Sequence, residues 1–141
     1  MTSCAPENRV FEEHQKLSPD VEWLKNDIKI FKVKIADSSP TYDFSIAFRY
    51  ANGYAWDVAK IIIKETSPSG KEKTTPYSLK IRDAQGNYLG ESGYDIWDST
   101  HPVEPSRKFE ETGIYTYTIS HDMPRDDFPW AMEVGLVIDR N

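Results

Sequence analysis

The feature that most constrains this chain is an alternation of bulky apolar residues with smaller or polar ones between residues 42 and 50. In a β-strand successive side chains point to opposite faces, so this spacing gathers five large side chains on one face. A helix would scatter them around its whole circumference. The segment therefore predicts a half-buried strand whose buried face is formed by Tyr42, Phe44, Ile46, Phe48 and Tyr50.

Other segments repeat this pattern and are separated by residues typical of turns. Strands are predicted over 31–35, 59–65, 77–81, 114–120 and 134–138, with a less regular one between 88 and 97. The run Ile61–Ile63 indicates a central strand covered on both faces. The side chains of Ile28 and Ile30 would point to the opposite face from Phe31, which suggests a bulge or a change of partner strand near Ile30. All nine prolines are assigned to the gaps, where a missing N–H costs no ladder hydrogen bond.

These strands predict an all-β fold with one domain. About seven or eight short strands separated by turns are typical of an antiparallel β-sandwich, immunoglobulin-like or jelly-roll-like. The length of 141 residues and the 38% hydrophobic content suit one core of ordinary size. The stretch Glu111–Tyr115, with Gly113 between, has the pattern of a tyrosine corner, in which the phenol hydroxyl binds upstream backbone.

The first 22 residues differ from the rest. They contain two prolines, several acids and few apolar residues, and Pro19 would stop any helical turn before it. We therefore expect residues 1–22 to be an N-terminal tether, with Val10 and Phe11 as the part that could dock on a domain formed by residues 23–141. Fully extended, the stretch 5–22 would reach about 60 Å.

Charge and cysteine content exclude several classes of protein. The chain has 17 basic and 23 acidic residues, a net charge of −6, whereas a nucleic-acid-binding protein normally shows a basic excess. Its one cysteine rules out an internal disulfide and a cysteine-cluster zinc site. The sequence contains no run of about 20 mostly apolar residues such as a membrane-spanning helix needs.

Catalytic and metal-binding motifs are missing or weak. The three histidines are far apart, Gly90–Gly93 is not a nucleophile elbow, and there is no glycine loop for phosphate. We therefore expect a protein without catalytic residues and without a cofactor, although a hydrolase with an unrecognised pair of carboxylates stays open. Four potential Ca²⁺ ligands recur every third residue, but a solvated polar loop without metal is the simpler interpretation. These four are Asp95, Asp98, His101 and Glu104.

Tryptophans offer the best candidate binding surface. Trp56, Trp97 and Trp130 are candidates for contact with a glycan, a peptide or a protein partner, because exposed aromatic faces often mark interfaces. Trp56 and Trp130 lie beside polar or proline-containing loops. The competing interpretation is that all four tryptophans fill or border the core.

The stretch Thr2–Ala5 resembles the end of a bacterial lipoprotein signal, in which small residues precede the cysteine that receives the lipid. No basic or apolar signal region precedes it, so we expect that such a signal has been removed from this sequence. On these residues alone, an accidental cysteine near an ordinary start is the simpler interpretation.

Taken together, nearly the whole chain resembles the gliding-motility lipoprotein family GldH of Bacteroidetes. The similarity starts at Val10–Glu13 and Trp23 and is clearest over Asp83–Ile96. There the family has an Asp, a Gly, an aromatic residue followed by Leu-Gly, another Gly and Asp-Ile, in that order. It continues through further positions in family order. These are Lys25, Asp27, Tyr42, Ile46, Arg49, Asn52, Gly53, Tyr54, Phe109, Gly113, Tyr115, Met123, Val134, Gly135 and Leu136. Tyr88 stands where Trp is expected, Val137 replaces a basic residue, and Phe128–Trp130 differs from the usual loop.

The resemblance implies an exported lipoprotein that carries its acyl chains, palmitate among them, on Cys4. It implies attachment to the bacterial outer membrane, partners among the envelope proteins of the gliding apparatus, and no catalytic activity or cofactor. Family members occur in species that do not visibly glide. The rival interpretation is a glycan- or peptide-binding β-sandwich that uses Trp56, Trp97 and Trp130.

Overall fold

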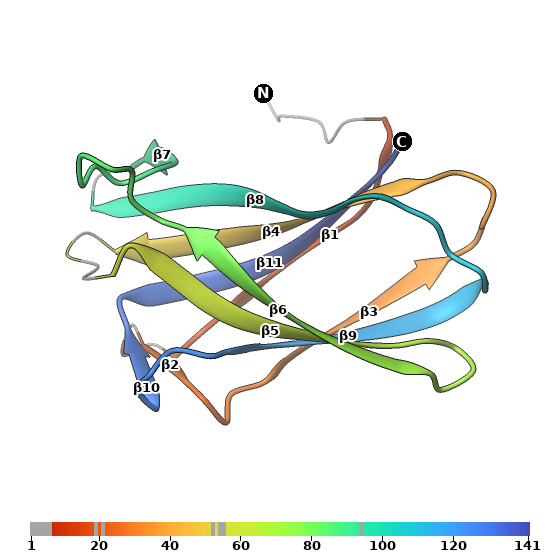
Figure 1. Cartoon of the computed structure of the whole chain (residues 1–141), viewed down its shortest axis with the longest axis horizontal. Helices are drawn as coiled ribbons and strands as arrows, with labels where there is room; N and C mark the ends of the chain where they lie inside the picture. Colours follow the sequence, from red (N-terminus) through yellow and green to blue (C-terminus); the bar gives the residue numbers. More distant parts are fainter. Residues whose placement is uncertain (1–6, 19, 21, 52, 54–55, 94) are drawn as a thin grey trace.

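The computed structural model describes residues 7–18, 20, 22–51, 53, 56–93 and 95–141, and this part of the chain folds as antiparallel β-structure (Figure 1). No helix in it has the length and apolar character needed to span a membrane. The described residues form eleven strands, more than the seven or eight predicted. They are β1 (Arg9–Lys16), β2 (Glu22–Leu24), β3 (Lys29–Ile35), β4 (Tyr42–Ala51), β5 (Val58–Thr66), β6 (Glu72–Lys80), β7 (Glu91–Ser92), β8 (Ile96–Arg107), β9 (Gly113–His121), β10 (Asp127–Pro129) and β11 (Ala131–Arg140).

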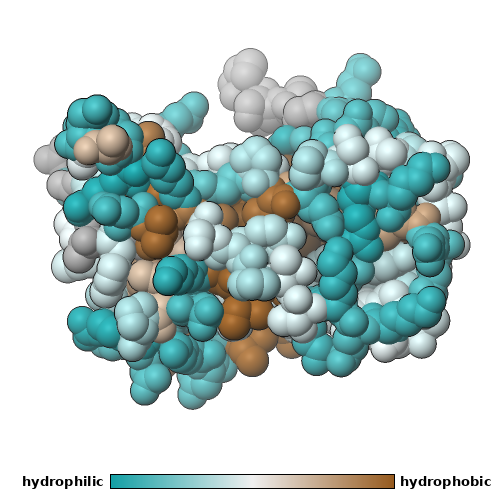
Figure 2. Space-filling model, viewed as in Figure 1, coloured by the Kyte–Doolittle hydropathy of each residue, from teal (hydrophilic) through white to brown (hydrophobic). Residues whose placement is uncertain are grey.

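Two sheets build the sandwich. The five-stranded sheet has the order β1-β11-β4-β8-β7 and the four-stranded sheet has the order β3-β9-β5-β6, while β2 and β10 pair separately. The sheets come together along both sides, β1 near β3 and β6 near β8. β7 pairs with only two residues of β8, so the rest of β8 is itself an edge. The predicted all-β antiparallel sandwich is confirmed. Over the face viewed in Figure 1, hydrophobic residues reach the surface mainly in the middle and hydrophilic residues surround them (Figure 2).

The alternating segment behaves as predicted. In β4 every second residue is buried, and all five predicted side chains are at most 4% exposed. They face the apolar side chains of the four-stranded sheet, Phe31, Val33, Ile61 and Ile119 among them. The alternation within this one strand therefore identified all of its core-facing side chains correctly.

The predicted boundary at residue 22 is wrong. Arg9–Lys16 is not a tether but the edge strand β1, paired with β11 from Arg9–Asp139 to Lys16–Glu133. Leu17 is 6% exposed, and Phe11 packs against the core as predicted. Val10, predicted to dock with it, is 42% exposed instead. An edge strand needs few apolar residues because water covers one side of it, which is why its composition resembles that of a linker.

Three further expectations are wrong. Four prolines lie within strands instead of in the gaps. Two of them, Pro102 and Pro105, lie in the part of β8 that pairs with β4 alone, and on the free edge of a strand a missing N–H breaks no hydrogen bond. β3 pairs with β9 along its whole length without a register shift, so there is neither a bulge nor a change of partner near Ile30, which is 53% exposed instead. β5 is central, but Ile62 is half-buried and points to the open outer face of its sheet.

The tyrosine corner is confirmed. The Tyr115 hydroxyl donates a hydrogen bond to the carbonyl oxygen of Glu111 at 2.8 Å. Gly113 between them has a φ of +129°, a conformation that side chains rarely adopt. The contact fixes the connection from β8 to β9, which carries the chain from one sheet to the other.

Candidate functional site

One end of the sandwich is filled with aromatic rings. β4 brings Phe48 and Tyr50 there, and β10 brings Phe128, whose ring stacks on Phe48 with 6.0 Å between centroids. Trp23 from β2 also stacks on Phe128, with 6.5 Å between centroids. The local reason is the β2–β10 pairing, which places Trp23 opposite Phe128. We call this part of the molecule the aromatic end. Its residues are Trp23, Phe48, Tyr50, Trp56, His121, Phe128 and Trp130.

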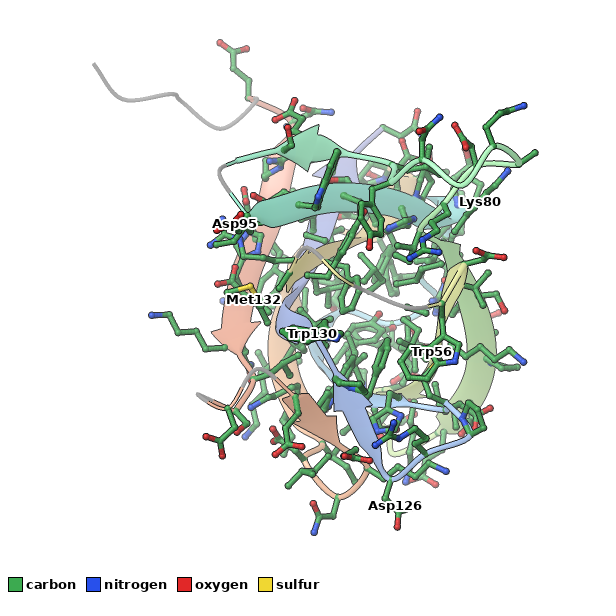
Figure 3. All side chains as sticks on the ribbon, turned by 90° about the vertical axis from the view of Figure 1, so that its left-hand side faces the viewer. Trp56, Lys80, Asp95, Asp126, Trp130 and Met132 are labelled. Carbon is green, nitrogen blue, oxygen red and sulfur yellow. The ribbon has the colours of Figure 1, made fainter. Side chains whose placement is uncertain are left out.

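The three candidate tryptophans differ in their surroundings. Trp56 is half-buried, with its ring edge against Phe128 at 5.8 Å, and Trp97 is half-buried against Tyr88 at 5.4 Å. Trp130 is 44% exposed and has a φ of +71°, a strained conformation for a bulky residue. Figure 3 shows Trp56 and Trp130 at the same end of the molecule. Trp130 is thus the most open of the three.

His121 lies inside the aromatic end and is 3% exposed. Its Nδ1 accepts a hydrogen bond from the Met123 N–H, so its Nε2 carries the proton and donates to the Asp126 carbonyl at 3.0 Å. Burial lowers the pKa of His121 and outweighs the opposing effect of the Asp126 carbonyl. A neutral imidazole with both nitrogens engaged is suited to packing rather than to proton transfer.

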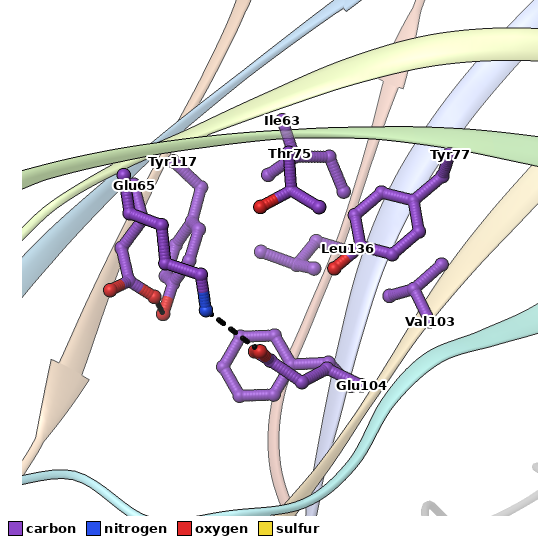
Figure 4. Close-up of a pocket in the computed structure, with 10 residues that line it drawn as sticks. Ile63, Glu65, Thr75, Tyr77, Val103, Glu104, Tyr117 and Leu136 are labelled. Atoms are coloured by element: carbon purple, nitrogen blue, oxygen red, sulfur yellow. Dashed lines mark hydrogen bonds and ion pairs between the residues drawn. The ribbon is translucent and has the colours of Figure 1, made fainter.

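A second candidate site lies between the edge strands β6 and β8. There a small, shallow pocket has an apolar floor that includes Phe44, Ile63 and Leu136 (Figure 4). Its polar rim is formed by Lys73 from β6 and Glu104 from β8, whose side chains form an ion pair across the opening at 3.1 Å. A polar hollow of about 230 Å³ continues from it and shares Lys73 and Glu65 with it. We call the two together the side cleft.

A partly buried ion cluster forms the wall of the side cleft. Both carboxylate oxygens of Glu65 accept hydrogen bonds from Arg107, at 2.6 and 2.8 Å, and the Tyr117 hydroxyl donates a third at 2.9 Å. Arg107 also binds Glu104 at 2.9 Å and lies 4.4 Å from the centre of the Phe109 ring. Glu65 is 8% exposed, so its charge is compensated almost entirely by protein groups.

The electrostatics of this cluster bear on the hydrolase alternative. Burial alone would raise the pKa of Glu65, but the hydrogen bonds and charge of Arg107 outweigh it and lower that pKa. A glycosidase acid needs the opposite, a carboxyl group whose pKa is raised so that it holds a proton near neutral pH. Since one guanidinium nitrogen binds both Glu65 and Glu104, this pair is better suited to joining two sheets than to acid–base chemistry.

The proposed Ca²⁺ ligands are not brought together. Residues 96–107 form β8 rather than the expected polar loop, and residues three apart in a strand point to opposite faces. His101 points to the core side of β8, where its Nε2 lies 2.7 Å from the Ser99 hydroxyl oxygen. Asp98 points to the outer face of the sheet and accepts a hydrogen bond from Arg49. Within the described residues there is no group of three or more potential metal-ligating side chains.

Sequence reasoning missed the Glu65–Arg107 pair, although a signal was present. Glu65 follows Ile61 and Ile63 at a spacing of two, so the strand predicted there already placed its carboxylate on the buried face. A buried carboxylate requires a partner. Which of the 17 basic residues supplies it depends on long-range pairing. Cys4, the predicted site of lipid attachment, lies outside the described residues.

Comparison with known proteins relates the chain to one family. The sequence model of the family described as GldH lipoprotein matches residues 9–138, from the first residue of β1 almost to the end of β11. The "Gliding motility lipoprotein GldH homolog" of Christiangramia forsetii is 26% identical over 124 residues, which cover 88% of this chain and 75% of the relative. The "Gliding motility lipoprotein GldH" of Flavobacterium johnsoniae is 25% identical over 108 residues, which cover 77% and 66%.

Solved structures are more distant. TmCBM61 in complex with β-1,4-galactotriose is 14% identical, with 91% of this chain and 69% of that chain covered and a TM-score of 0.33. A 4-O-methyl-α-glucuronidase specific for decorated arabinogalactans is 12% identical, with 98% and 19% covered and a TM-score of 0.41. At these scores neither structure bears on the function of this chain.

Proposed function

The chain belongs to the GldH lipoprotein family, and on this premise we propose that it is an exported lipoprotein that serves the gliding-motility machinery without catalysing a reaction. In this proposal acyl chains on Cys4 hold it at the bacterial outer membrane, and its β-sandwich contacts other envelope proteins of the apparatus. Several acyl chains anchor far more firmly than one, since each buried methylene contributes about 0.8 kcal/mol.

The observation that carries the proposal is the extent of the family match. Residues 9–138 include both sheets, so the match concerns the whole folded unit rather than a local motif. Both curated relatives are named as gliding-motility lipoproteins or their homologues. The position of Cys4 ahead of β1 agrees with a lipid anchor, because the modified residue would precede the domain.

The geometry supports a binding or scaffolding role better than catalysis. The buried ionisable groups that might have reacted are fully engaged within the protein, Glu65 by Arg107 and Tyr117, and His121 by backbone groups. For the glycan- or peptide-binding alternative, the rings of Trp56 and Trp97 pack against Phe128 and Tyr88, and of the three candidates only Trp130 extends well into solvent. A sugar platform normally requires an open aromatic face.

The anchor can be tested in membranes of the native bacterium. We expect mass spectrometry of the amino-terminal peptide to find Cys4 as the acylated first residue, and we expect the protein in the outer-membrane fraction. Cys4→Ala should move the folded protein out of that fraction when the membranes are washed at high salt, which removes electrostatically bound protein. An unmodified Cys4 behind an intact Met1 would contradict the anchor.

The role in motility requires a separate experiment. Deletion of the gene should abolish or slow cell movement on a surface, and the wild-type gene should restore it while Cys4→Ala should not. In a host that does not glide, cross-linking in intact cells should recover envelope proteins of the gliding apparatus. Normal movement after deletion, together with cross-links only to unrelated proteins, would refute the role.

A further inference from the structure

The outer face of the four-stranded sheet is strongly basic in an otherwise acidic protein. Strand alternation and register bring five lysines onto it, two from β3, two from β5 and one from β6. Its one acidic strand residue, Glu72, forms an ion pair with Lys64 at 3.0 Å. The chain as a whole has a net charge of −6, so positive charge is concentrated on this side. The five residues of this lysine face are Lys32, Lys34, Lys60, Lys64 and Lys80.

The charges of the lysine face are available to a ligand. Lys32, Lys34, Lys60 and Lys80 are exposed, and none of the four forms an ion pair within the part of the chain that the structure describes. Between them the strands present uncharged residues, chiefly threonines of β9 and isoleucines. Ile30 is 53% and Ile114 49% exposed. A flat surface of lysines interspersed with exposed isoleucines can both attract an anionic layer and contact apolar groups at its border.

The opposite face of the sandwich has the reverse character. On the outer side of the five-stranded sheet, acids outnumber bases, and the arginines there are already paired with them. Arg9 binds Asp139 at 2.8 Å, and Arg49 binds Asp98 at 2.8 Å. An anionic surface would therefore attract one face of the molecule and repel the other, which defines an orientation.

We propose that the lysine face lies against anionic phospholipid headgroups of the membrane that holds the lipid anchor. This inference rests on the proposed function, because the anchor supplies the proximity. Only the stretch from Cys4 to Arg9 would separate the lipid from β1, and it can span at most about 17 Å. β1 contacts β3 at its far end, where the Gln15 amide donates a hydrogen bond to the Ile30 carbonyl, about 20 Å along the strand from Arg9. Packed sheets are about 10 Å apart, less than the span of the Cys4–Arg9 stretch, so the anchor allows the sandwich to lie on the membrane with the lysine face toward it.

The test uses the full chain carrying Cys4→Ser, so that lipidation cannot contribute. Its binding is measured by co-sedimentation with phosphatidylcholine vesicles and with vesicles in which phosphatidylglycerol replaces about a third of that lipid. We expect binding only to the anionic vesicles and a steep loss of binding as salt is added. The variant K32Q/K34Q/K60Q/K80Q should bind far more weakly, by about fivefold for each lysine removed.

A matched control separates the position of charge from its amount. K16Q/K25Q/K71Q/K108Q removes four exposed lysines outside the lysine face and changes the net charge equally. It should retain most of the binding. Circular dichroism checks that both variants fold, as expected for exposed side chains without ion pairs.

Several results would overturn the inference. Equal weakening by the two variants would mean that only net charge matters, and equal binding to neutral vesicles would exclude the headgroup charge as the cause. Self-association that depends on the lysine face, without vesicle binding, would identify the acidic face of a second copy as the occupant. Because Cys4→Ser removes the anchor, failure here leaves the proposed function intact, while an unmodified native Cys4 would remove that function without affecting vesicle binding.

Discussion

Replacement of Arg107 by methionine should destabilise the folded protein by about 3 kcal/mol at neutral pH. Glu65 is a buried residue, 8% exposed as a whole. The change leaves its carboxylate without the two hydrogen bonds from Arg107, at 2.6 and 2.8 Å, that compensate its charge. Removal of one partner of a buried pair costs about 3–5 kcal/mol, and side-chain exposures of 17% and 11% place this pair at the lower end. Methionine still covers Phe109, so packing contributes little to the loss.

The pH dependence makes this prediction specific to charge. In the native protein the pKa of Glu65 is lowered, so its contribution to stability is present above the ordinary carboxyl pKa and is lost as pH falls through the lowered value. Without Arg107, burial raises the pKa of Glu65 instead, and the penalty is relieved as the carboxylate takes up a proton. The difference between wild type and R107M should therefore shrink between pH 7 and about pH 5.

Urea unfolding followed by tryptophan fluorescence provides the assay, at both pH values. The control is Arg49→Met, which removes a similar two-point contact with Asp98 at a site where the side chains are 40% and 53% exposed. That variant should lose less than about 1 kcal/mol. A loss below about 1 kcal/mol for R107M, or a loss that stays constant with pH, would refute the assignment of Glu65 as a buried compensated charge.

Three other predictions follow from the fold. Tyr115→Phe removes the hydrogen bond to Glu111 and should lower the free energy of unfolding by about 1 kcal/mol in the same urea assay. Trp130→Gly should leave stability unchanged or raise it by up to about 1 kcal/mol, because glycine relieves the positive φ of an exposed residue; a clear loss would mean that the ring packs as part of the core. A chain trimmed to residues 23–141 should aggregate or unfold, since it lacks β1; cooperative unfolding like that of the full chain would contradict the role given to that strand.

The parts of the fold that the sequence predicted are those with a local signal. β4, β5, β9 and β11 each carry apolar residues at a spacing of two, and this pattern is visible without knowledge of their partners. β1 has no such pattern. It contributes one ring to the core and gains its hydrogen bonds from a strand at the opposite end of the chain, which no local rule can identify.

The candidate site was less predictable for a related reason. The sequence identified the aromatic residues but not which of them stack. It took the segment 95–104 for a polar loop, in which Pro102 and Pro105 would break any helix, whereas most of that segment lies in β8. Those prolines are tolerated because that part of β8 borders the side cleft and has one neighbour, β4. The cleft exists because two edge strands from different sheets come together, β6 and β8, and their adjacency follows from topology rather than from either sequence.

The reassignment of Arg9–Lys16 from tether to strand also changes what the proposed anchor allows. An 18-residue tether could carry the domain about 60 Å from the lipid, whereas the stretch from Cys4 to Arg9 permits at most about 17 Å. Much of a sandwich only two sheets deep, each about 10 Å from the next, then stays close to the membrane surface. A partner that binds the side cleft or the aromatic end must therefore itself reach that surface, so the anchor restricts the choice of partner as well as the location of the domain.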